Sequence, residues 1–580
     1  MKFARTGFLA STIGAGLSVF ALAAPATADA AGNRFRATIP DGGQGEAGEL
    51  RTPLQFEEEA IDHPQTGTQS LFSRCRRAPF GTTGLYGVIT APDSDAIVGD
   101  TAFSFADGSS CYNPQNEQNI VINPANSLNV VTSANEYRGN VHAVYFSTNG
   151  GLSWTNVALP GWTSSSGGSG QFSHLDSCGD PVLAFSRDGS RLYYTGLVCN
   201  FDKFPRTMSG VAIAVSTDGG ANWAPPTMVD YRASGDFFTD KEWITTGPGD
   251  TVYLTWTKFY QGPRGLGYLR SPIVMASSSN GGKSWSSVKA VSDDSHPYNQ
   301  GSQVVVSSNG TVYVAYEGSD PATGYATDQL VVARSVDGGT TFTNNQIARV
   351  FDDLDCYPFQ LPGAQGRQTL SFEQFRINSF PSMAIDPSND QLAIVWADNE
   401  GSGTCGNGGF GFAGTTSNQV KLVTSTNGLT WSAPRKITTG VADKVYPSVG
   451  ANAGRIVVGY YTRAYSPVPS GAASAATRRC GITELDSVTG LPVLPANAAR
   501  AAAPVCLDWA LRSSTDNFAA ETRVTSESSN PYILFAGSFI GDYTGTAVAA
   551  NGKAVTVWTD FRGNPGTTSP NQDVVVRSGY

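Results

Sequence analysis

One short phrase recurs along the chain, and it limits the folds that the chain can adopt. The phrase sets a Ser two residues before an Asp or Asn, continues with Gly, and ends on an aromatic residue. Four copies have eight residues, a fifth has seven and a sixth is altered; they begin at Ser147, Ser216, Ser278, Ser335, Ser425 and Ser514. Each copy follows an apolar run typical of a strand. Such a repeat predicts a modular fold built from similar sheets.

The phrase has the chemistry of a hairpin turn. The Asp or Asn side-chain oxygen accepts hydrogen bonds from amides two residues on. Gly takes the left-handed dihedrals that other residues resist. The Ser hydroxyl braces the loop, and the Trp or Phe returns into the sheet as a packing anchor. We therefore interpret these polar residues as structural, although they look like metal ligands.

Pairs of apolar strands lie between the copies. The seven pairs cover residues 119–134, 180–196, 242–257, 303–316, 381–397, 446–461 and 544–559. A pair and a hairpin make one four-stranded sheet, so the chain is predicted to be an all-β, seven-bladed β-propeller. The last strand, over 573–580, has nothing after it. We therefore expect the N-terminal region to supply an outer strand that closes the ring.

The repeated phrase resembles the Asp boxes, or bacterial neuraminidase repeats, of sialidases and related propellers. The resemblance covers about residues 115–580 and implies Asp-box turns, with a six-bladed sialidase-type propeller as the alternative to seven blades. The sialidase arginine signature is absent, because no Phe/Tyr-Arg-Ile-Pro phrase occurs and Arg36-Ala-Thr-Ile-Pro40 has a different spacing. Sialidase roles are therefore not transferred to residues of this chain.

The first 30 residues are typical of a signal peptide. Lys2 and Arg5 precede an apolar run over 7–24, and small residues offer cleavage sites over 26–30. We expect a secreted protein, extracellular or periplasmic. No later run of about 18 apolar residues occurs, so no membrane span is expected. The domains expected are a signal peptide over 1–30, an N-terminal segment over 31–115 that contributes to ring closure, and the propeller over 116–580 with an insertion at about 464–504.

The eight cysteines are an even number in an exported chain, which predicts disulfides. Pairing neighbours along the chain gives Cys75–Cys111, Cys178–Cys199, Cys356–Cys405 and Cys480–Cys506, out of 105 connectivities. The sequence contains no CxxC pair and no His-rich cluster, so a zinc site is not expected. No cofactor is expected; acidic loops leave a structural calcium open, without EF-hand-like spacing. The net charge of −10 argues against nucleic acid, so the expected partner is an extracellular glycan or glycoprotein, with the oligomeric state undetermined.

Propeller geometry gathers polar residues at one end of the axis. Innermost strands begin at the end where second strands finish, and the hairpin phrases lie at the opposite end. The candidates at strand starts are Asp240, Glu242, Asp542 and Tyr543, beside Glu117, Asp180, Lys241, Gln300 and Tyr446. The candidates at second-strand ends are Arg138, Arg463, Asp560 and Arg562, beside Lys258, Glu317 and Asp398. His174 and His296 lie in loops that lead into first strands.

These residue types suit a sugar site. Carboxylates transfer protons, Arg binds an anionic substituent, with Arg138, Arg463 and Arg562 as a candidate trio, and aromatic rings stack on sugars. We interpret the protein as a carbohydrate-active propeller, a sialidase-like glycoside hydrolase acting on acidic glycans. Two alternatives stay open: a uronic-acid polysaccharide lyase using His174, His296, Tyr543 and Arg562, or a non-catalytic extracellular binding module. The density of carboxylates and Arg favours an enzyme without deciding the question.

Overall fold

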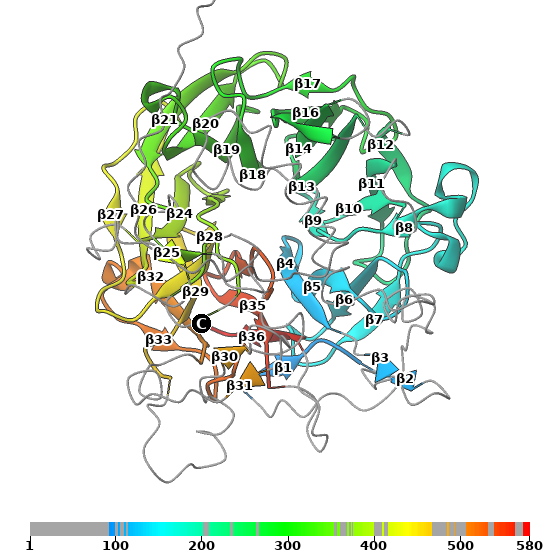
Figure 1. The fold of residues 1–580 in the computed structure, drawn as a ribbon. Coiled ribbons are helices and arrows are strands. Elements are labelled where there is room, and N and C mark those ends of the chain that lie inside the picture. The colour runs from blue at the N-terminus through cyan, green and yellow to red at the C-terminus, as the bar shows by residue number, and fades with distance from the viewer. Residues whose placement is uncertain are drawn as a thin grey trace, which may run out of the picture.

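The computed structural model is a β-propeller whose sheets follow one another around a ring (Figure 1). Seven blades are present, and no α-helix occurs among the described residues. The prediction of an all-β, seven-bladed propeller is confirmed, and the six-bladed alternative is wrong. The structure describes residues 92–98, 114–200, 208–232, 236–262, 266–352, 357–359, 368–370, 373, 375–399, 416–466, 506–531, 539–562 and 572–580, with the short strands 103–104, 110–111, 409–410, 484–485 and 492–493.

The blades are numbered in chain order, and their strands are given from the axis outwards. Blade 1 contains β4 (Gln115–Asn123), β5 (Asn126–Glu136), β6 (Ala143–Ser147) and β7 (Thr155–Ala158). In blade 2, β8 (Asp176–Ser177) and β9 (Val182–Phe185) both pair with β10 (Leu192–Cys199), followed by β11 (Ser209–Ser216) and β12 (Thr227–Arg232). Blade 3 contains β13 (Phe237–Thr246), β14 (Val252–Gly262), β16 (Ile273–Ser278) and β17 (Lys289–Ala290), with β15 (Leu266–Arg270) added to β14.

The other four blades are regular. Blade 4 contains β18 (Asn299–Val306), β19 (Val312–Ser319), β20 (Asp328–Ser335) and β21 (Thr343–Arg349). Blade 5 contains β23 (Ser382–Ile385), β24 (Leu392–Asp398), β26 (Gln419–Ser425) and β27 (Arg435–Lys436). Blade 6 contains β28 (Lys444–Asn452), β29 (Arg455–Thr462), β32 (Asp508–Ser513) and β33 (Thr522–Arg523). Blade 7 contains β34 (Gly545–Val548), β35 (Ala554–Asp560), β36 (Asp573–Ser578) and β1 (Ser94–Asp95).

Short elements lie outside the blades. Three two-stranded ladders pair β2 (Phe103–Ser104) with β3 (Ser110–Cys111), β22 (Pro358–Phe359) with β25 (Gly409–Phe410), and β30 (Glu484–Leu485) with β31 (Pro492–Val493). Single 3-10 turns are η1 (Ser164–Ser166), η2 (Gly170–His174), η4 (Pro321–Thr323) and η6 (Ser514–Asp516). In chain order, the predicted insertion at 464–504 falls between β29 and β32 of blade 6.

The N- and C-terminal parts of the chain meet in blade 7. Strand β1 pairs antiparallel with β36, so the fourth strand of the last blade comes from residues that precede the first blade. The buried Asp93 next to β1 forms ion pairs with Arg577 at 2.7 Å and with Arg562 at 3.0 Å. Blade 7 is therefore held together by segments more than 400 residues apart.

Each blade is buried on both faces because it packs between two neighbours. The second strands are consequently almost continuous apolar runs, as in Leu392–Asp398, which is buried at every position. Side chains alternate between the two interfaces: Val312 and Val314 pack towards blade 3, and Tyr313 and Ala315 pack towards blade 5. The core is therefore a series of packed inter-blade layers around the ring.

The repeated phrases form tight turns between third and fourth strands. In the first copy, Asn149 Oδ1 accepts hydrogen bonds from the amides of Leu152 and Ser153 at 3.1 and 3.0 Å, and Ser147 Oγ accepts one from Gly151 at 2.9 Å. In this copy the amides are three and four residues on and not two as predicted, whereas in the shorter fifth copy Asn427 Oδ1 accepts a hydrogen bond from the amide of Leu429, two residues on, at 2.8 Å. The returning Trp154 is buried. The polar residues of this turn bond one another, which fits their predicted structural role.

One predicted disulfide is confirmed, and it joins Cys178 to Cys199. It ties the segment before β9 to the end of β10 within blade 2. Cys506 is also disulfide-bonded. The remaining predicted cysteine partners and the predicted signal peptide lie outside the residues whose side chains are described. No helix in the described part of the chain is long and apolar enough to span a bilayer.

Candidate functional site

Bulges in the innermost strands determine which side chains reach the axis. In blades 1, 3, 4 and 6 the innermost strand has one residue more than its partner near its start. The extra residues are Glu117, Lys241, Gly301 and Tyr446, with left-handed φ angles of 57°, 50°, 66° and 50°, and Asp180 in blade 2 has φ 54°. This conformation is uncommon outside Gly, and a bulge re-aims the side chain that it carries. The same device therefore recurs at the same end of five blades.

Lys241 is the centre of a buried ion-pair cluster. Its Nζ lies 3.0 Å from Glu117 Oε1, 3.1 Å from Asp180 Oδ2 and 2.8 Å from Asp542 Oδ2. Arg376 binds the same Asp542 carboxylate in a bidentate pair, with distances of 2.9 Å from Nε and 2.7 Å from Nη2. These five residues come from blades 1, 2, 3 and 7 and from the loop before blade 5. They therefore meet across the ring, and we call them the axial cluster.

A second layer of hydrogen bonds holds the axial cluster in place. Asn135 donates to Glu117 Oε2 at 2.7 Å, and the amide of Asp542 donates to Glu117 Oε1 at 3.0 Å. The neighbouring Asp240 accepts a hydrogen bond from Gln300 at 2.6 Å. Asn378 donates to the carbonyl of Asp542 at 3.1 Å. Amides from three blades thus position the carboxylates, and Asn378 fixes the backbone that carries Asp542.

Acidic groups outnumber cations at the axis. Burial raises the pKa of the Glu117, Asp180 and Asp240 carboxyls, and the nearby Asp180 charge raises that of Glu117 further. Asp542 is the exception: against the effect of its burial, Arg376 and then Lys241 lower its pKa well below the usual range. Asp542 is therefore ionised across the physiological range, whereas its acidic neighbours retain protons to a higher pH.

Two polar groups beside the axial cluster have no hydrogen-bond partner within the described chain. Both carboxyl oxygens of Glu242 are buried without one, and so is the Tyr543 hydroxyl. Burial, followed by the Asp180 charge, raises the pKa of Glu242 well above its ordinary value. The Tyr543 ring lies 5.5 Å from Lys241 Nζ and makes an edge contact with Trp243 at 6.2 Å. Burial and the Asp180 charge thus favour the protonated form of the Glu242 carboxyl, which adjoins the axial cluster.

Four of the predicted site residues belong to this region. Asp542 is part of the axial cluster, and Asp240, Glu242 and Tyr543 adjoin it, as their electrostatic coupling to Asp180, Lys241 or Asp542 shows. They are neighbours because first strands of all blades start at one end of the axis.

The predicted arginine trio does not form. Arg138 pairs with Glu136 at 2.7 Å, Arg463 with Asp443, and Arg562 with Asp560 at 2.7 Å. Second strands lie outside the first strands, so an arginine at a second-strand end meets carboxylates of its own blade or of the adjoining loops before it reaches the axis. The predicted Asp560 is likewise occupied, by Arg562 and by the indole of Trp558 at 3.1 Å.

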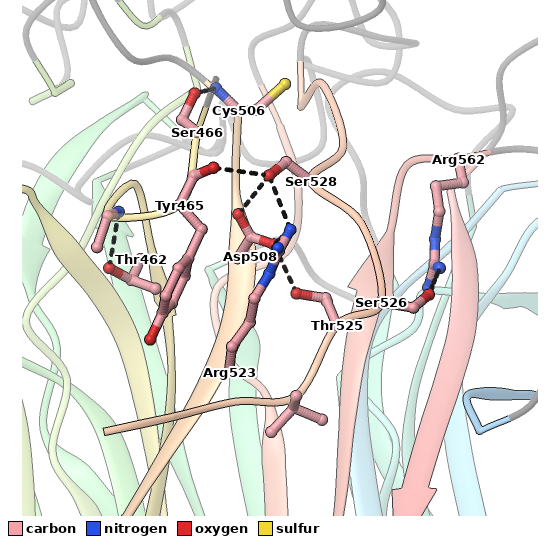
Figure 2. A network of polar contacts seen from close by, with 12 residues as sticks. Thr462, Tyr465, Ser466, Cys506, Asp508, Arg523, Thr525, Ser526, Ser528 and Arg562 are labelled. Carbon is pink, nitrogen blue, oxygen red and sulfur yellow. Dashed lines mark hydrogen bonds and ion pairs between the residues drawn. The ribbon is translucent and has the colours of Figure 1, made fainter. Parts of the chain in front are cut away.

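Figure 2 shows the outer polar network of which Arg562 is part, at the rim of blades 6 and 7. Arg562 donates to Ser526 Oγ at 2.8 Å. Nearby, the Asp508 carboxylate accepts hydrogen bonds from Arg523, Thr525 and Ser528 at 2.7 Å each. These donors and acceptors bond one another, so the network is structural in character.

The two predicted histidines lie away from the axial cluster and from each other. His174 is exposed on η2, with its Nδ1 2.8 Å from Ser173 Oγ. His296 follows β17 and its Nδ1 lies 2.8 Å from Asp293 Oδ1. The loops into first strands are long enough to keep both side chains off the axis.

Arg376 is the residue that the sequence reasoning missed. It lies in the segment before β23, where neither the turn phrase nor a strand pair marks its position. Lys241, by contrast, stands in the phrase Asp240-Lys-Glu-Trp243 at a strand start and was placed at the correct end. No local sequence signal pairs Arg376 with Asp542, because the two are 166 residues apart.

One group of carboxylates has the spacing of a metal site. Oxygens of the buried Glu317, Asp328 and Asp352 lie within 4.8 Å of one another. An all-oxygen set suits a hard cation such as calcium. Each of the three, however, already has an interaction with another group of the protein. The expectation of a structural calcium therefore stays a prediction.

Comparison with known proteins shows resemblance in fold only. No protein-family model matches the chain, and no curated protein matches it. Among solved structures, a Dyadobacter fermentans protein of unknown function is 12% identical, with 69% of this chain and 93% of that chain covered and a TM-score of 0.39. A Penicillium chrysogenum alpha-L-arabinanase in complex with arabinobiose is 13% identical, with coverage of 60% and 88% and a TM-score of 0.38.

A Trypanosoma rangeli sialidase is also similar, at 11% identity, with 66% of this chain and 58% of that chain covered and a TM-score of 0.37. Identities and TM-scores this low transfer neither a residue role nor a substrate to this chain.

Proposed function

We propose that this protein is a secreted, carbohydrate-active propeller that hydrolyses a glycosidic bond at the axial end. The observation that carries the proposal is that two unlike carboxyl groups, Glu242 and Asp542, both interact electrostatically with Lys241 at the axis. Glu242 is buried, without a hydrogen-bond partner in the described structure and with a raised pKa. Asp542 is held ionised by Arg376 and Lys241.

This pairing matches what glycoside hydrolysis requires. One carboxylic acid must carry a proton for the leaving oxygen, and one carboxylate must activate water or stabilise positive charge on the sugar. Groups whose environments separate their pKa values take these two roles. In the proposed mechanism Glu242 is the general acid, and the ionised carboxylate of Asp542 in the axial cluster faces the developing positive charge.

The charged groups at the axial end lead us to propose a different substrate from the one expected from the sequence. Both cations of the axial cluster already bind carboxylates, and five acidic groups surround them: Glu117, Asp180, Asp240, Glu242 and Asp542. Because both cations are already held by carboxylates of the protein, a negatively charged substituent would find no free cation there. We therefore propose a neutral glycan as the substrate of the axial end, in place of the acidic glycan that the sequence suggested.

A lyase mechanism is less well supported. Proton abstraction next to a carboxylate needs a Tyr or His base and free cations. Burial, followed by the charges of Asp180 and Glu117, raises the pKa of the Tyr543 phenol and keeps it protonated. His174 and His296 make their described contacts elsewhere.

The test is a screen of the purified chain on neutral and acidic glycans, with reducing ends and ultraviolet absorbance as readouts. We expect new reducing ends without an unsaturated product. Glu242→Gln should lower turnover by about 100-fold or more, the usual worth of a general acid, with an unchanged melting temperature. Glu521→Gln, which alters a carboxylate bonded to Tyr460 and Tyr465 in blade 6, is the matched control and should retain activity.

The burial of the axial cluster favours a second candidate function. Its side chains are at most 8% exposed, which suits a structural plug in a non-catalytic module that binds extracellular glycans or glycoproteins. For such a module, the screen would give neither reducing ends nor ultraviolet absorbance, and Glu242→Gln would leave glycan binding unchanged.

A further inference from the structure

A cavity away from the axis opens in blade 3, and it shares no residue with the axial cluster. Its volume is about 300 Å³, at the lower end of the range for ligand pockets. It lies at the end of β14 and between β16, β17 and the loop to β18, at the same end of the propeller as the axial cluster. Its lining includes Tyr260, Arg270, Val274, Val288, Lys289 and Asp293.

The rim of this cavity carries two uncompensated cations. Arg270 is exposed and Lys289 is partly exposed, and no ion pair to either is formed within the described chain. Arg270 lies over the Tyr260 ring, with its guanidinium carbon 4.6 Å from the ring centroid. The stacking directs the guanidinium without occupying its hydrogen-bond donors. Both cations can therefore bind an anion that enters the cavity.

The other charges of the cavity are already paired. Lys258 Nζ is 2.8 Å from Asp230 of blade 2 and 4.3 Å from the Phe237 ring centroid. Asp293 accepts hydrogen bonds from Ser295 and contacts His296, interactions that lower its pKa against the effect of burial. Asp293 and Asp294 are the exposed carboxylates at the rim. Arg270 and Lys289 are left as the positive groups available to a ligand.

Part of the cavity wall is apolar. Val274 is buried, Val288 is half-buried, and Pro272, Ala290 and Pro297 add further apolar surface. Together with the Tyr260 ring they provide carbon surfaces for the C–H face of a sugar. A small, partly apolar cavity with two free cations at its mouth fits a ring that carries one carboxylate.

We propose that this cavity binds a carboxylate-bearing saccharide through Arg270 and Lys289. This binding site is separate from the site of the proposed hydrolysis, because it lies off the axis. It would bind an acidic saccharide, whereas the substrate proposed for the axial end is neutral. It would anchor an acidic unit of a glycan on the same end of the propeller as the axial cluster.

Calorimetric titration of the full chain tests the proposal. The probes are digalacturonate and N-acetylneuraminate, which carry the carboxylate on different sugars, and lactose as the neutral counterpart. We expect at least one acidic probe to bind and lactose to bind at least tenfold more weakly. Arg270→Gln with Lys289→Gln should weaken acidic binding by about 100-fold, or tenfold for each charge-assisted contact.

The matched control also removes two positive charges, but at positions far from the cavity. Lys283→Gln with Lys553→Gln changes exposed lysines in turns at the opposite end of the propeller, and it should bind as the wild type does. The proposal is overturned if neither acidic probe binds, if lactose binds equally well, or if the two double variants behave alike. Because binding alone is measured, the outcome is independent of hydrolysis at the axial end.

Discussion

At the scale of the residue, Lys241 shows how one cation stabilises several buried carboxylates. Its ammonium contacts three acidic side chains while only 6% of the lysine side chain is exposed. An unpaired carboxylate in such a place is costly, so removal of one partner of a buried ion pair destabilises far more than loss of a surface pair. The left-handed backbone at Lys241 is tolerated because it delivers the ammonium to this position.

Lys241→Met should therefore destabilise the fold. We expect the free energy of unfolding to fall by about 3–5 kcal/mol, the usual cost of breaking a buried pair, as measured by denaturant titration. Lys283→Met, at an exposed position, should change it by less than about 0.5 kcal/mol. A small effect at Lys241 would mean that the neighbouring acids simply take up protons.

His142 is a buried residue whose ionisation opposes folding. It lies between blades 1 and 2, with its ring centroid 4.3 Å from that of Trp162 and its Nδ1 2.9 Å from the Tyr194 hydroxyl. Burial lowers its pKa to about 3. Below about pH 6.5 the unfolded chain binds a proton here that the folded chain does not. The stability present above pH 6.5 is consequently lost as the pH falls.

Between pH 8 and pH 5 this linkage should lower the free energy of unfolding by about 2 kcal/mol. His142→Gln removes the titrating group, so the wild type should lose about 2 kcal/mol more than this variant over that range. Urea unfolding at several pH values measures the difference. His174→Gln, on the exposed η2, is the control, and parallel pH profiles for wild type and His142→Gln would contradict the assignment.

At the scale of the element, the repeated turns also dock on the neighbouring blade. Gly428, in the shortened fifth copy, has φ 67°, and a methyl group added to it would overlap the Tyr313 ring of blade 4. Gly310, in the turn between β18 and β19, has φ 86° and open space around its Cα. The two glycines share the left-handed backbone and differ only in packing.

Replacing each of these two glycines by Ala separates the cost of a strained backbone from the cost of packing against the neighbouring blade. Gly310→Ala should cost about 1–2 kcal/mol, because only the left-handed conformation penalises the methyl group. Gly428→Ala should cost about 1–3 kcal/mol more, since it also overpacks the interface between blades 4 and 5. Thermal unfolding of both variants measures the difference, and equal losses would show that the turn does not pack against Tyr313 tightly.

At the scale of the whole molecule, stability depends on closing the ring. Strand β1 contributes only two residues to blade 7, so the ion pairs of Asp93 with Arg562 and Arg577 add much to a short ladder. The Asp93 side chain is fully buried. One buried carboxylate, Asp93, therefore supplies both ion pairs that support the closure.

Asp93→Asn should weaken the closure. It leaves two arginines short of their shared carboxylate, and we expect a loss of about 3 kcal/mol in the free energy of unfolding. Hydrogen exchange should become faster in β1 and β36 before the other blades are affected. Asp250→Asn breaks an exposed pair with Arg191 and should cost less than about 1 kcal/mol; equal effects of the two variants would rule out the proposed role of Asp93.

The sequence by itself determined the architecture. Turn chemistry, strand periodicity and repeat number are local properties. The copies of the phrase and the seven strand pairs between them were therefore sufficient to predict seven blades and the end at which Glu242 and Asp542 lie. The pairing of Cys178 with Cys199 followed from their closeness in the chain. None of these features depends on how distant blades meet.

Only the tertiary structure decided how the charges are paired. Lys241 and Asp542 are about 300 residues apart, and the bulges and loops that bring them together carry no local signature. The arginines at second-strand ends are bound by nearby carboxylates, whereas Arg376, in a segment without a motif, reaches Asp542. Ion pairing depends on distances of a few ångströms across the ring, and these are set by the closed fold rather than by any stretch of sequence.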